Sequence, residues 1–165
     1  MHTHEETPPP IAVLDIDGVL ADVRHRLHHL DQRPKSWPGF FAAATSDPLL
    51  AEGAAVAHRL AQDHEVVYLT GRPERCRQDT LHWLRSHGLP EGALLMRREN
   101  DRRPARQAKL AHLRALSVRG TVAILVDDDP EVIDAATAAG LPVMLADWVP
   151  RPRVLAKAQE QEGRL

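Results

Sequence analysis

The sequence predicts an α/β fold in which a doubly wound, Rossmann-like parallel sheet is flanked by helices. Short apolar runs rich in β-branched residues, such as 11–14 and 122–126, alternate with longer stretches whose apolar residues recur at helical spacing. Most of these runs end in polar residues with a glycine or proline close by, as expected where a buried strand passes into a loop. Strands that alternate with helices form right-handed crossovers and therefore a parallel sheet.

Five strands are expected along the chain, at 11–14, 66–69, 93–96, 122–126 and 142–146. Helices are expected at 53–62, at 74–87, after Pro104 and at 131–139. Gly88 and Gly140 are placed to end two of these helices, and Pro104 is suited to the start of a third. Residues 24–50, which follow the first strand, predict a small helical insertion over the strand ends.

The chain of 165 residues fits one domain. We expect 11–150 to form that domain, 1–10 to be a disordered tail that ends in three prolines, and 151–165 to be a polar C-terminal tail that frays. A net charge of −2 argues against nucleic-acid binding through bulk charge and leaves a local basic patch open. The single cysteine, Cys76, and the lack of a membrane-spanning apolar run or a secretion signal predict a cytoplasmic protein.

Polar side chains follow the predicted strands at the edge of the sheet where their carboxyl ends meet. Two acids end the first strand, a threonine and an arginine follow the second, a lysine lies on the helix after the third, and two acids follow the fourth. These residues are Asp15, Asp17, Thr70, Arg72, Lys109, Asp127 and Asp128. Ligands of open α/β sheets bind at this edge, and two acids so close together need a cation or a shared proton to coexist. The set can therefore hold Mg²⁺ and a phosphoryl group.

Four stretches in this order resemble the motifs of the haloacid dehalogenase-like (HAD) phosphohydrolase superfamily. They are Asp15-Ile16-Asp17-Gly18-Val19-Leu20, Leu69-Thr70-Gly71-Arg72, the helical Lys109, and Val126-Asp127-Asp128. The resemblance extends from about Ile11 to Trp148. It implies a HAD-like fold and a Mg²⁺-dependent phosphatase that works through an aspartyl-phosphate intermediate.

The resemblance also implies a role for each catalytic residue. Asp15 would be the nucleophile, and Asp17 would protonate the leaving alcohol and then activate water, which requires that its neighbours raise its pKa. Thr70 would hydrogen-bond the phosphoryl oxygens. Lys109 would neutralise charge on Asp15 and on the phosphate.

Mg²⁺ would be bound by three groups: Asp128, a carboxylate oxygen of Asp15, and the backbone carbonyl of Asp17. Asp127 would be a further ligand or would lie just behind the ligands. The turn at Gly18 would let backbone N–H groups approach the phosphate.

Within the superfamily, the phosphatase domain of bacteriophage-type polynucleotide kinase is more closely similar. The shared features are the small insertion, the Gly71-Arg72 pair, and the run Met96-Arg97-Arg98 before an Asp-x-Arg segment. The similarity implies that Arg26, Gly71 and Arg72 bind the phosphate. The acidic residue that this family has four positions before the lysine is Ala105 here, so its contribution must come from elsewhere or be absent. No kinase domain with a phosphate-binding Gly-x-x-x-x-Gly-Lys-Ser/Thr loop is found in the sequence, which predicts a free-standing phosphatase.

The expected substrate is a nucleotide or a polynucleotide 3′-phosphate end, as in nucleic acid repair, because a small insertion leaves room for a bulky substrate. A phosphatase of small metabolites, such as 5′-nucleotides or sugar phosphates, is the alternative. A receiver-like module that accepts a phosphoryl group on aspartate is disfavoured by the Asp-x-Asp-Gly order. No membrane partner is expected. Whether the insertion closes over the ligand stays open.

Several other side chains have competing interpretations. His25, His28 and His29 are expected on a solvated face or near the substrate rather than on a metal, because no acid or cysteine lies at ligand spacing. At least two of the aromatic residues at positions 37, 40 and 41 are expected in the core rather than stacked on a base. The run 97–103 suits contact with a nucleic-acid backbone and simple solvation about equally. Trp83 and Trp148 are expected to pack.

Overall fold

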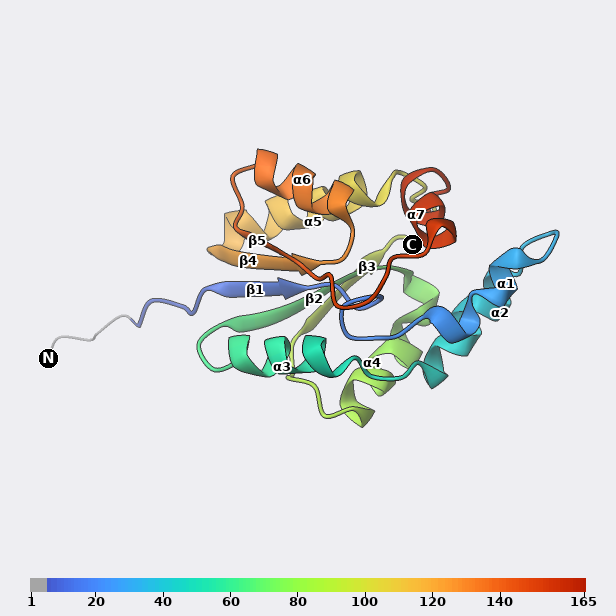
Figure 1. The fold of residues 1–165 in the computed structure, drawn as a ribbon. Coiled ribbons are helices and arrows are strands. Elements are labelled where there is room, and N and C mark those ends of the chain that lie inside the picture. The colour runs from blue at the N-terminus through green and yellow to red at the C-terminus, as the bar shows by residue number, and fades with distance from the viewer. Residues whose placement is uncertain (1–5) are drawn as a thin grey trace, which may run out of the picture.

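The computed structural model describes residues 6–165, and a five-stranded parallel sheet forms its centre (Figure 1). The strands are β1 (Ile11–Leu14), β2 (Glu65–Pro73), β3 (Ala93–Arg97), β4 (Val122–Asp127) and β5 (Val143–Leu145). Their order across the sheet is β3-β2-β1-β4-β5. The strand order therefore reverses beside β1, and the groove at the carboxyl end of such a reversal is where open α/β sheets bind ligands.

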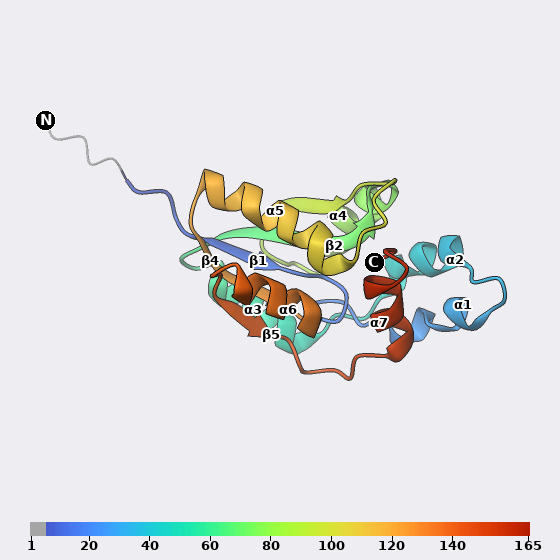
Figure 2. The same cartoon turned by 90° about the horizontal axis from the view of Figure 1, so that it is seen from above.

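Helices cover both faces of the sheet. The chain forms α3 (Ala51–Leu60), α4 (Arg77–Ser86), α5 (Ala105–Arg119) and α6 (Pro130–Ala138) between the strands. Figures 1 and 2 show α3 and α4 on one face and α5 and α6 on the other. Every residue of β1 is at most 1% exposed, which explains its uninterrupted apolar sequence. The predicted doubly wound α/β fold is confirmed.

The largest differences from the predicted boundaries lie at β2 and at the helix that follows it, and the other predicted strands and helices agree with the structure to within about two residues. The strand expected at 66–69 continues to Pro73, because the register between β2 and β3 shifts after Leu69 and Pro73 still pairs with Arg97. The helix expected at 74–87 divides into a short 3-10 helix, η3 (Glu74–Cys76), and α4. The second motif, 70–72, is thus part of a strand and has a fixed backbone.

The insertion consists of four short elements at the carboxyl end of the sheet. They are η1 (Arg24–Arg26), α1 (His28–Asp31), α2 (Trp37–Ala42) and η2 (Ala43–Ser46), the η elements being 3-10 helices. Phe40 and Phe41 are 0% and 4% exposed, so the expectation of at least two core aromatic residues is confirmed. Trp83 and Trp148 pack against the core as expected.

The expectation of a fraying tail at 151–165 is wrong. Residues 153–160 form helix α7 (Arg153–Glu160), which lies beside the insertion in both views (Figures 1 and 2). Leu155 and Leu165 are 3% and 2% exposed and pack with the apolar residues of the insertion. The polar composition concealed this packing, because a short amphipathic helix needs only a few apolar residues on one face.

At the other end of the chain, residues 1–5 of the expected tail 1–10 lie outside the described residues. Residues 6–10 belong to no helix or strand. Among the described helices, none is both long enough and apolar enough to span a membrane.

The packing of α7 predicts that it contributes to global stability. Leu155→Ala should lower the free energy of unfolding in urea by about 2–5 kcal/mol, because it leaves a cavity between α7 and the insertion. Val118→Ala on α5, where the side chain is 91% exposed, is the control and should change it by less than about 0.5 kcal/mol. Equal, small effects of both substitutions would mean that α7 is not part of the cooperative fold.

Candidate active site

A tight turn after β1 places the two acids of the first motif. Asp15 donates its backbone N–H to the carbonyl of Val126 at 2.9 Å, so it still lies beside β4. The chain then turns at Ile16, whose carbonyl accepts the N–H groups of Leu20 and Ala21 at 2.8 and 3.0 Å. Both acids are therefore buried at the carboxyl end of β1.

Gly18 lets the ends of β1 and β4 meet. It has a φ of +79°, a left-handed conformation that residues with side chains rarely adopt. A Cβ at this position would lie 2.1 Å from Oδ2 of Asp128. Any larger residue would therefore displace the Asp128 carboxylate from the turn.

Lys109 lies between the acids of β1 and β4. Its Nζ donates to Oδ2 of Asp127 at 2.6 Å and lies 3.1 Å from Oδ1 of Asp15. Burial disfavours the charged amine, but the carboxylates of Asp127 and Asp15 outweigh burial and raise the pKa of Lys109. Although Ala105 leaves the first turn of α5 without an acid, Asp127 orients the lysine from β4.

Three carboxylates form a group that could hold a metal ion. Asp15, Asp127 and Asp128 each offer an oxygen atom, and these atoms lie within 4.8 Å of one another. Oδ1 of Asp128 is buried without a hydrogen-bond partner in the described part of the chain, an arrangement that a cation would satisfy. Burial and the neighbouring acid Asp127 raise the pKa of Asp128 to about 7, and burial raises the pKa of Asp15 well above its ordinary value. An all-oxygen donor set of this kind fits a divalent cation.

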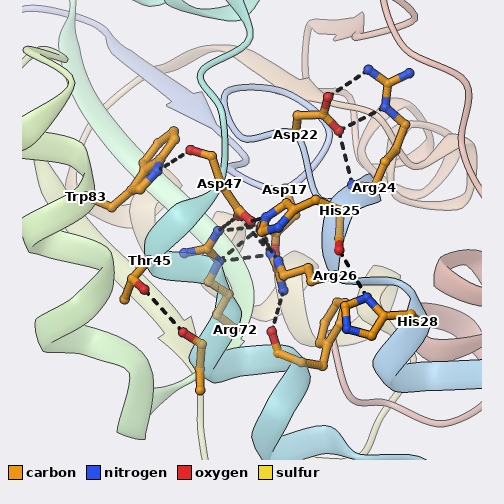
Figure 3. A network of polar contacts seen from close by, with 12 residues as sticks. Asp17, Asp22, Arg24, His25, Arg26, His28, Thr45, Asp47, Arg72 and Trp83 are labelled. Carbon is orange, nitrogen blue, oxygen red and sulfur yellow. Dashed lines mark hydrogen bonds and ion pairs between the residues drawn. The ribbon is translucent and has the colours of Figure 1, made fainter. Parts of the chain in front are cut away.

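The carboxylate of Asp17 is not part of this group and faces two arginines instead. Arg72 donates to its Oδ1 from Nη2 at 2.6 Å, and Arg26 donates to the same oxygen from Nη2 at 2.9 Å (Figure 3). Burial alone would raise the pKa of Asp17, but the charges of Arg72 and Arg26 outweigh it and hold this pKa below its ordinary value. In this arrangement the neighbours of Asp17 do not raise its pKa, which the role of proton donor requires.

Asp47, which the sequence analysis did not single out, belongs to the same network. It is 2% exposed and accepts hydrogen bonds from Arg26 and Arg72. His25 is the histidine of the insertion that reaches this network, with Nε2 2.6 Å from Oδ1 of Asp47. In the sequence, an aspartate before a proline indicates only a turn. Asp47 reaches the site because the insertion folds back over the carboxyl ends of the strands.

Thr70 and Gly71 complete the end of β2. Oγ1 of Thr70 accepts the N–H of Arg72 at 3.1 Å, and Thr70 is 2% exposed. Gly71 lies against the C-terminal segment, since a Cβ there would be 1.9 Å from the carbonyl carbon of Leu165. Arg97 of β3 donates to the carbonyl oxygen of Leu165 at 3.1 Å. The end of the chain thus borders the second motif.

The two interpretations of the run 97–103 apply to different residues within it. Arg97 is buried and structural, because its Nη1 also donates to the carbonyls of Asp101 and Arg103 at 3.3 and 2.8 Å. Arg98, Arg102 and Arg103 are exposed on the surface of the loop, and Arg103 pairs with Asp101 at 2.8 Å. Only these exposed arginines remain available for an external ligand.

The structure therefore brings all the predicted site residues to one edge of the sheet, in two halves. One half combines a lysine with three acids that fit a metal ion. The other half consists of two arginines around the second acid of β1. Because β1 lies between β2 and β4, the two halves approach β1 from opposite neighbours. A phosphoryl group placed there would lie close to the carboxylates of Asp15 and Asp17 and to positive charge from both halves.

Solved structures share this fold. A structure titled as the Pnkp1/Rnl/Hen1 complex is 25% identical with a TM-score of 0.71, over 86% of this chain and 47% of that one. A structure of the Pnkp1/Rnl/Hen1 RNA repair complex is 26% identical with a TM-score of 0.71, over 84% of this chain and 42% of that one. This chain spans less than half the length of either. A haloacid dehalogenase-like hydrolase from Streptococcus pneumoniae is 13% identical with a TM-score of 0.63, over 93% and 92% of the two chains, and shows the fold alone.

The fold and the site define the class of this protein, a HAD-like phosphatase and thus a phosphoric monoester hydrolase. Residues 9–147 match the family model of the polynucleotide kinase PNKP phosphatase domain, and the chain belongs to that family. No curated protein matches it. The resemblance inferred from the four motifs is confirmed.

The raised pKa of Asp128 predicts pH-dependent stability of the metal-free protein. Between the ordinary value of 3.8 and about 7, the folded state holds a proton that the unfolded state has released. The free energy of unfolding in urea with EDTA should therefore fall as the pH rises through this range, by on the order of 1 kcal/mol per pH unit. Asp128→Asn should reduce this slope, and Asp15, whose pKa is also raised by burial, should account for part of the slope that remains. An unchanged slope in that variant would assign the proton to another group.

Proposed function

We propose that this protein is a Mg²⁺-dependent phosphatase that acts through an aspartyl-phosphate on Asp15, and that its substrate is a polynucleotide 3′-phosphate end. The observation that carries the mechanism is the pair of opposed counter-charges at the end of β1. Lys109 lies 3.1 Å from Asp15 on the β4 side, while Arg26 and Arg72 converge on Asp17 from the insertion and β2. This arrangement suits a dianionic group bound over Asp15.

The proposed reaction has two steps. An oxygen of Asp15 attacks phosphorus, the bond from phosphorus to the alcohol oxygen breaks, and Asp17 gives that oxygen a proton. Asp17 then takes a proton from water, which attacks phosphorus, so that inorganic phosphate leaves and the Asp15 carboxylate returns. Burial raises the pKa of Asp15, and the charge of Lys109 opposes this effect and favours the ionised carboxylate that attacks phosphorus. Mg²⁺, held by Asp15 and Asp128 with the backbone carbonyl of Asp17, supplies further positive charge for the phosphoryl oxygens when bound.

The low pKa of Asp17 sets a requirement on this reaction. With both arginines on it, the carboxylate suits the role of a base. Proton donation requires the phosphoryl oxygens to draw Arg26 and Arg72 away, because burial alone raises the pKa of an acid. Arginines that bind the phosphate thereby also prepare Asp17 as the acid.

The family and the rim of the site support a polynucleotide substrate. The family is named for polynucleotide kinase, and one of the similar structures is an RNA repair complex. Partial burial and the charges of Arg102 and Arg75 lower the pKa of Arg164, so these three arginines lie close together. Arg164 precedes Leu165, which lies against Gly71 at the site. A basic rim of this kind suits the backbone phosphates of a nucleic acid.

The burial of the site favours a second candidate, a phosphatase of small phosphomonoesters. Asp15, Asp17, Thr70 and Lys109 are only 2% to 4% exposed, and a 5′-nucleotide or sugar phosphate enters a closed site more easily than a polymer does. Measurements of kcat/KM for 3′-phosphorylated DNA and RNA, mononucleotides and sugar phosphates decide between the two. A polynucleotide phosphatase should prefer the oligonucleotides by about tenfold or more.

Asp15→Asn should abolish turnover, by about 10³-fold or more, because an amide cannot attack phosphorus. The measurement is hydrolysis of p-nitrophenyl phosphate and of a 3′-phosphorylated oligonucleotide with Mg²⁺, and EDTA should also stop it. Asp63→Asn, at an exposed acid remote from the site, is the matched control and should retain activity. Turnover by Asp15→Asn would eliminate the assigned nucleophile. A wild-type chain inactive on both substrates with Mg²⁺ would refute the phosphatase itself.

Asp17→Asn should separate the two steps. p-Nitrophenolate leaves without a proton, so the first step should continue, whereas hydrolysis of the phosphoenzyme should stall without a base. Rapid mixing with p-nitrophenyl phosphate should give a burst of about one p-nitrophenolate per protein, followed by slow turnover. Steady release without a burst, at the wild-type rate, would show that Asp17 is not the base.

A further inference from the structure

Asp47 is a buried acid that the proposed reaction does not use. We propose that Asp47 is a positioning residue that holds Arg26 and Arg72 side by side, so that both guanidinium groups face the phosphoryl group. This proposal rests on the proposed function, because it concerns the phosphate-binding half of the same site. It assigns a specific task to the insertion, which supplies both Asp47 and Arg26.

The two acids and two arginines form a closed ring of hydrogen bonds (Figure 3). Arg26 makes two bonds to Asp47, from Nε at 2.9 Å and from Nη2 at 3.0 Å. Arg72 makes three bonds to Asp17, two from Nε at 3.1 and 3.2 Å and one from Nη2 at 2.6 Å. Each Nη2 also reaches the other acid, at 2.9 Å from Arg26 to Asp17 and at 3.0 Å from Arg72 to Asp47. The acids thereby fix the orientation of each guanidinium group relative to the other.

One acid is not enough to balance the positive charges of the two buried arginines. Arg26 and Arg72 are 0% and 1% exposed, and buried cations are costly unless they are paired. Asp17 belongs to the reacting end of β1, where a bound phosphoryl group competes with it for the two arginines. Asp47 comes from the insertion, so its two bonds to Arg26 lie outside that competition. It supplies the second negative charge and keeps the arginines oriented when they turn to the phosphate.

The surroundings of Asp47 hold it in one position. Its backbone N–H donates to the carbonyl of Ala44 at 3.1 Å, and its carbonyl accepts Nε1 of Trp83 at 2.9 Å. Trp83 is a core residue of α4, so it ties Asp47 to the main body of the protein. The His25 ring fixes the carboxylate from the other end, with Nε2 2.6 Å from Oδ1. A positioning residue needs such support from behind.

A second ion pair of the same type provides a matched control. Asp22 pairs with Arg24 at 2.7 Å, just before Arg26 in the sequence, but Arg24 is exposed (Figure 3). Within residues 6–165, the side chains of this pair make no hydrogen bond to the ring around Asp17. Asp22→Asn therefore reproduces the loss of an acid from an Asp–Arg pair without disturbing the phosphate-binding half.

The test compares Asp47→Asn with Asp22→Asn in the full chain loaded with Mg²⁺. Calorimetry gives the dissociation constant of inorganic phosphate. Hydrolysis of p-nitrophenyl phosphate gives KM, kcat and the Mg²⁺ concentration needed for half-maximal activity. Asp47→Asn should weaken phosphate binding and raise KM by about 10–100-fold, as expected when a partner that orients a binding group is lost. The Mg²⁺ concentration for half-maximal activity should change by less than about twofold, and Asp22→Asn should resemble the wild type. A merely structural role would lower the fraction of active protein, and hence kcat, while KM and phosphate affinity stayed the same, and would overturn the proposal.

A double variant tests whether Asp47 acts through the arginines. If it does, Asp47→Asn should weaken phosphate binding much less in an Arg26→Ala background than in the wild type, because the main partner is already lost. Fully additive losses would overturn the proposal. If Asp47→Asn does not fold, Asp47→Ser, which leaves room for water around the guanidinium groups, replaces it. Failure of both variants to fold would make Asp47 a folding residue and would also overturn the proposal.

The calorimetric measurement separates this proposal from the proposed function. If the wild type binds phosphate without turning over any phosphomonoester, the proposed function fails, and the effect of Asp47→Asn on phosphate affinity still decides the role of Asp47. If turnover occurs and Asp47→Asn leaves both phosphate affinity and KM unchanged, only the positioning role fails. If the wild type binds no phosphate, both fail.

Discussion

The burial of two carboxylates at the end of β1 governs the arrangement of this site. Asp15 and Asp17 are 2% and 3% exposed, and each needs its own counter-charge. The counter-charges come from different elements: Lys109 of α5 lies 3.1 Å from Asp15, and Arg72 of β2 donates to Asp17. Burial raises the pKa of Asp15, while the arginines lower that of Asp17. Two identical side chains thus obtain different chemistry, which is how enzymes divide the tasks of a nucleophile and a proton carrier.

The charged residues around these two acids are themselves paired with further buried charges. Asp127 accepts the Lys109 amine with one oxygen and the N–H of Asp129 with the other, at 2.6 and 2.9 Å. Asp129 in turn pairs with Arg151 at 3.0 Å, just before α7. On the other side, Asp47 compensates the arginines from the insertion. This network of buried charges connects the acids at the end of β1 to both the insertion and the segment just before the C-terminal helix.

Local patterns were sufficient to predict much of the fold. The strands at 11–14 and 122–126 were recognised because a strand buried on both faces is apolar at every position. The limits of β2 were harder to predict, because its last residues pair through an irregular register with β3 and carry polar side chains for the site. Helix α7 was missed because its stability depends on Leu155 meeting the apolar residues of the insertion, a contact between segments far apart in the sequence.

In the site, too, some features follow from local sequence patterns and others depend on contacts between segments far apart in the sequence. From the sequence alone, the spacing of Asp15 and Asp17, the position of Thr70 and Lys109, and the acids after β4 indicated the family and predicted phosphoryl chemistry. A doubly wound sheet brings the ends of its strands, and the start of the helix that carries Lys109, to one edge. Folding determined the rest. Asp47 acquired a role only when the insertion returned to the strand ends, and the pKa of Asp17 depended on how many arginines reached it. Electrostatic effects act through distances in space, and no sequence pattern specifies those distances for a loop.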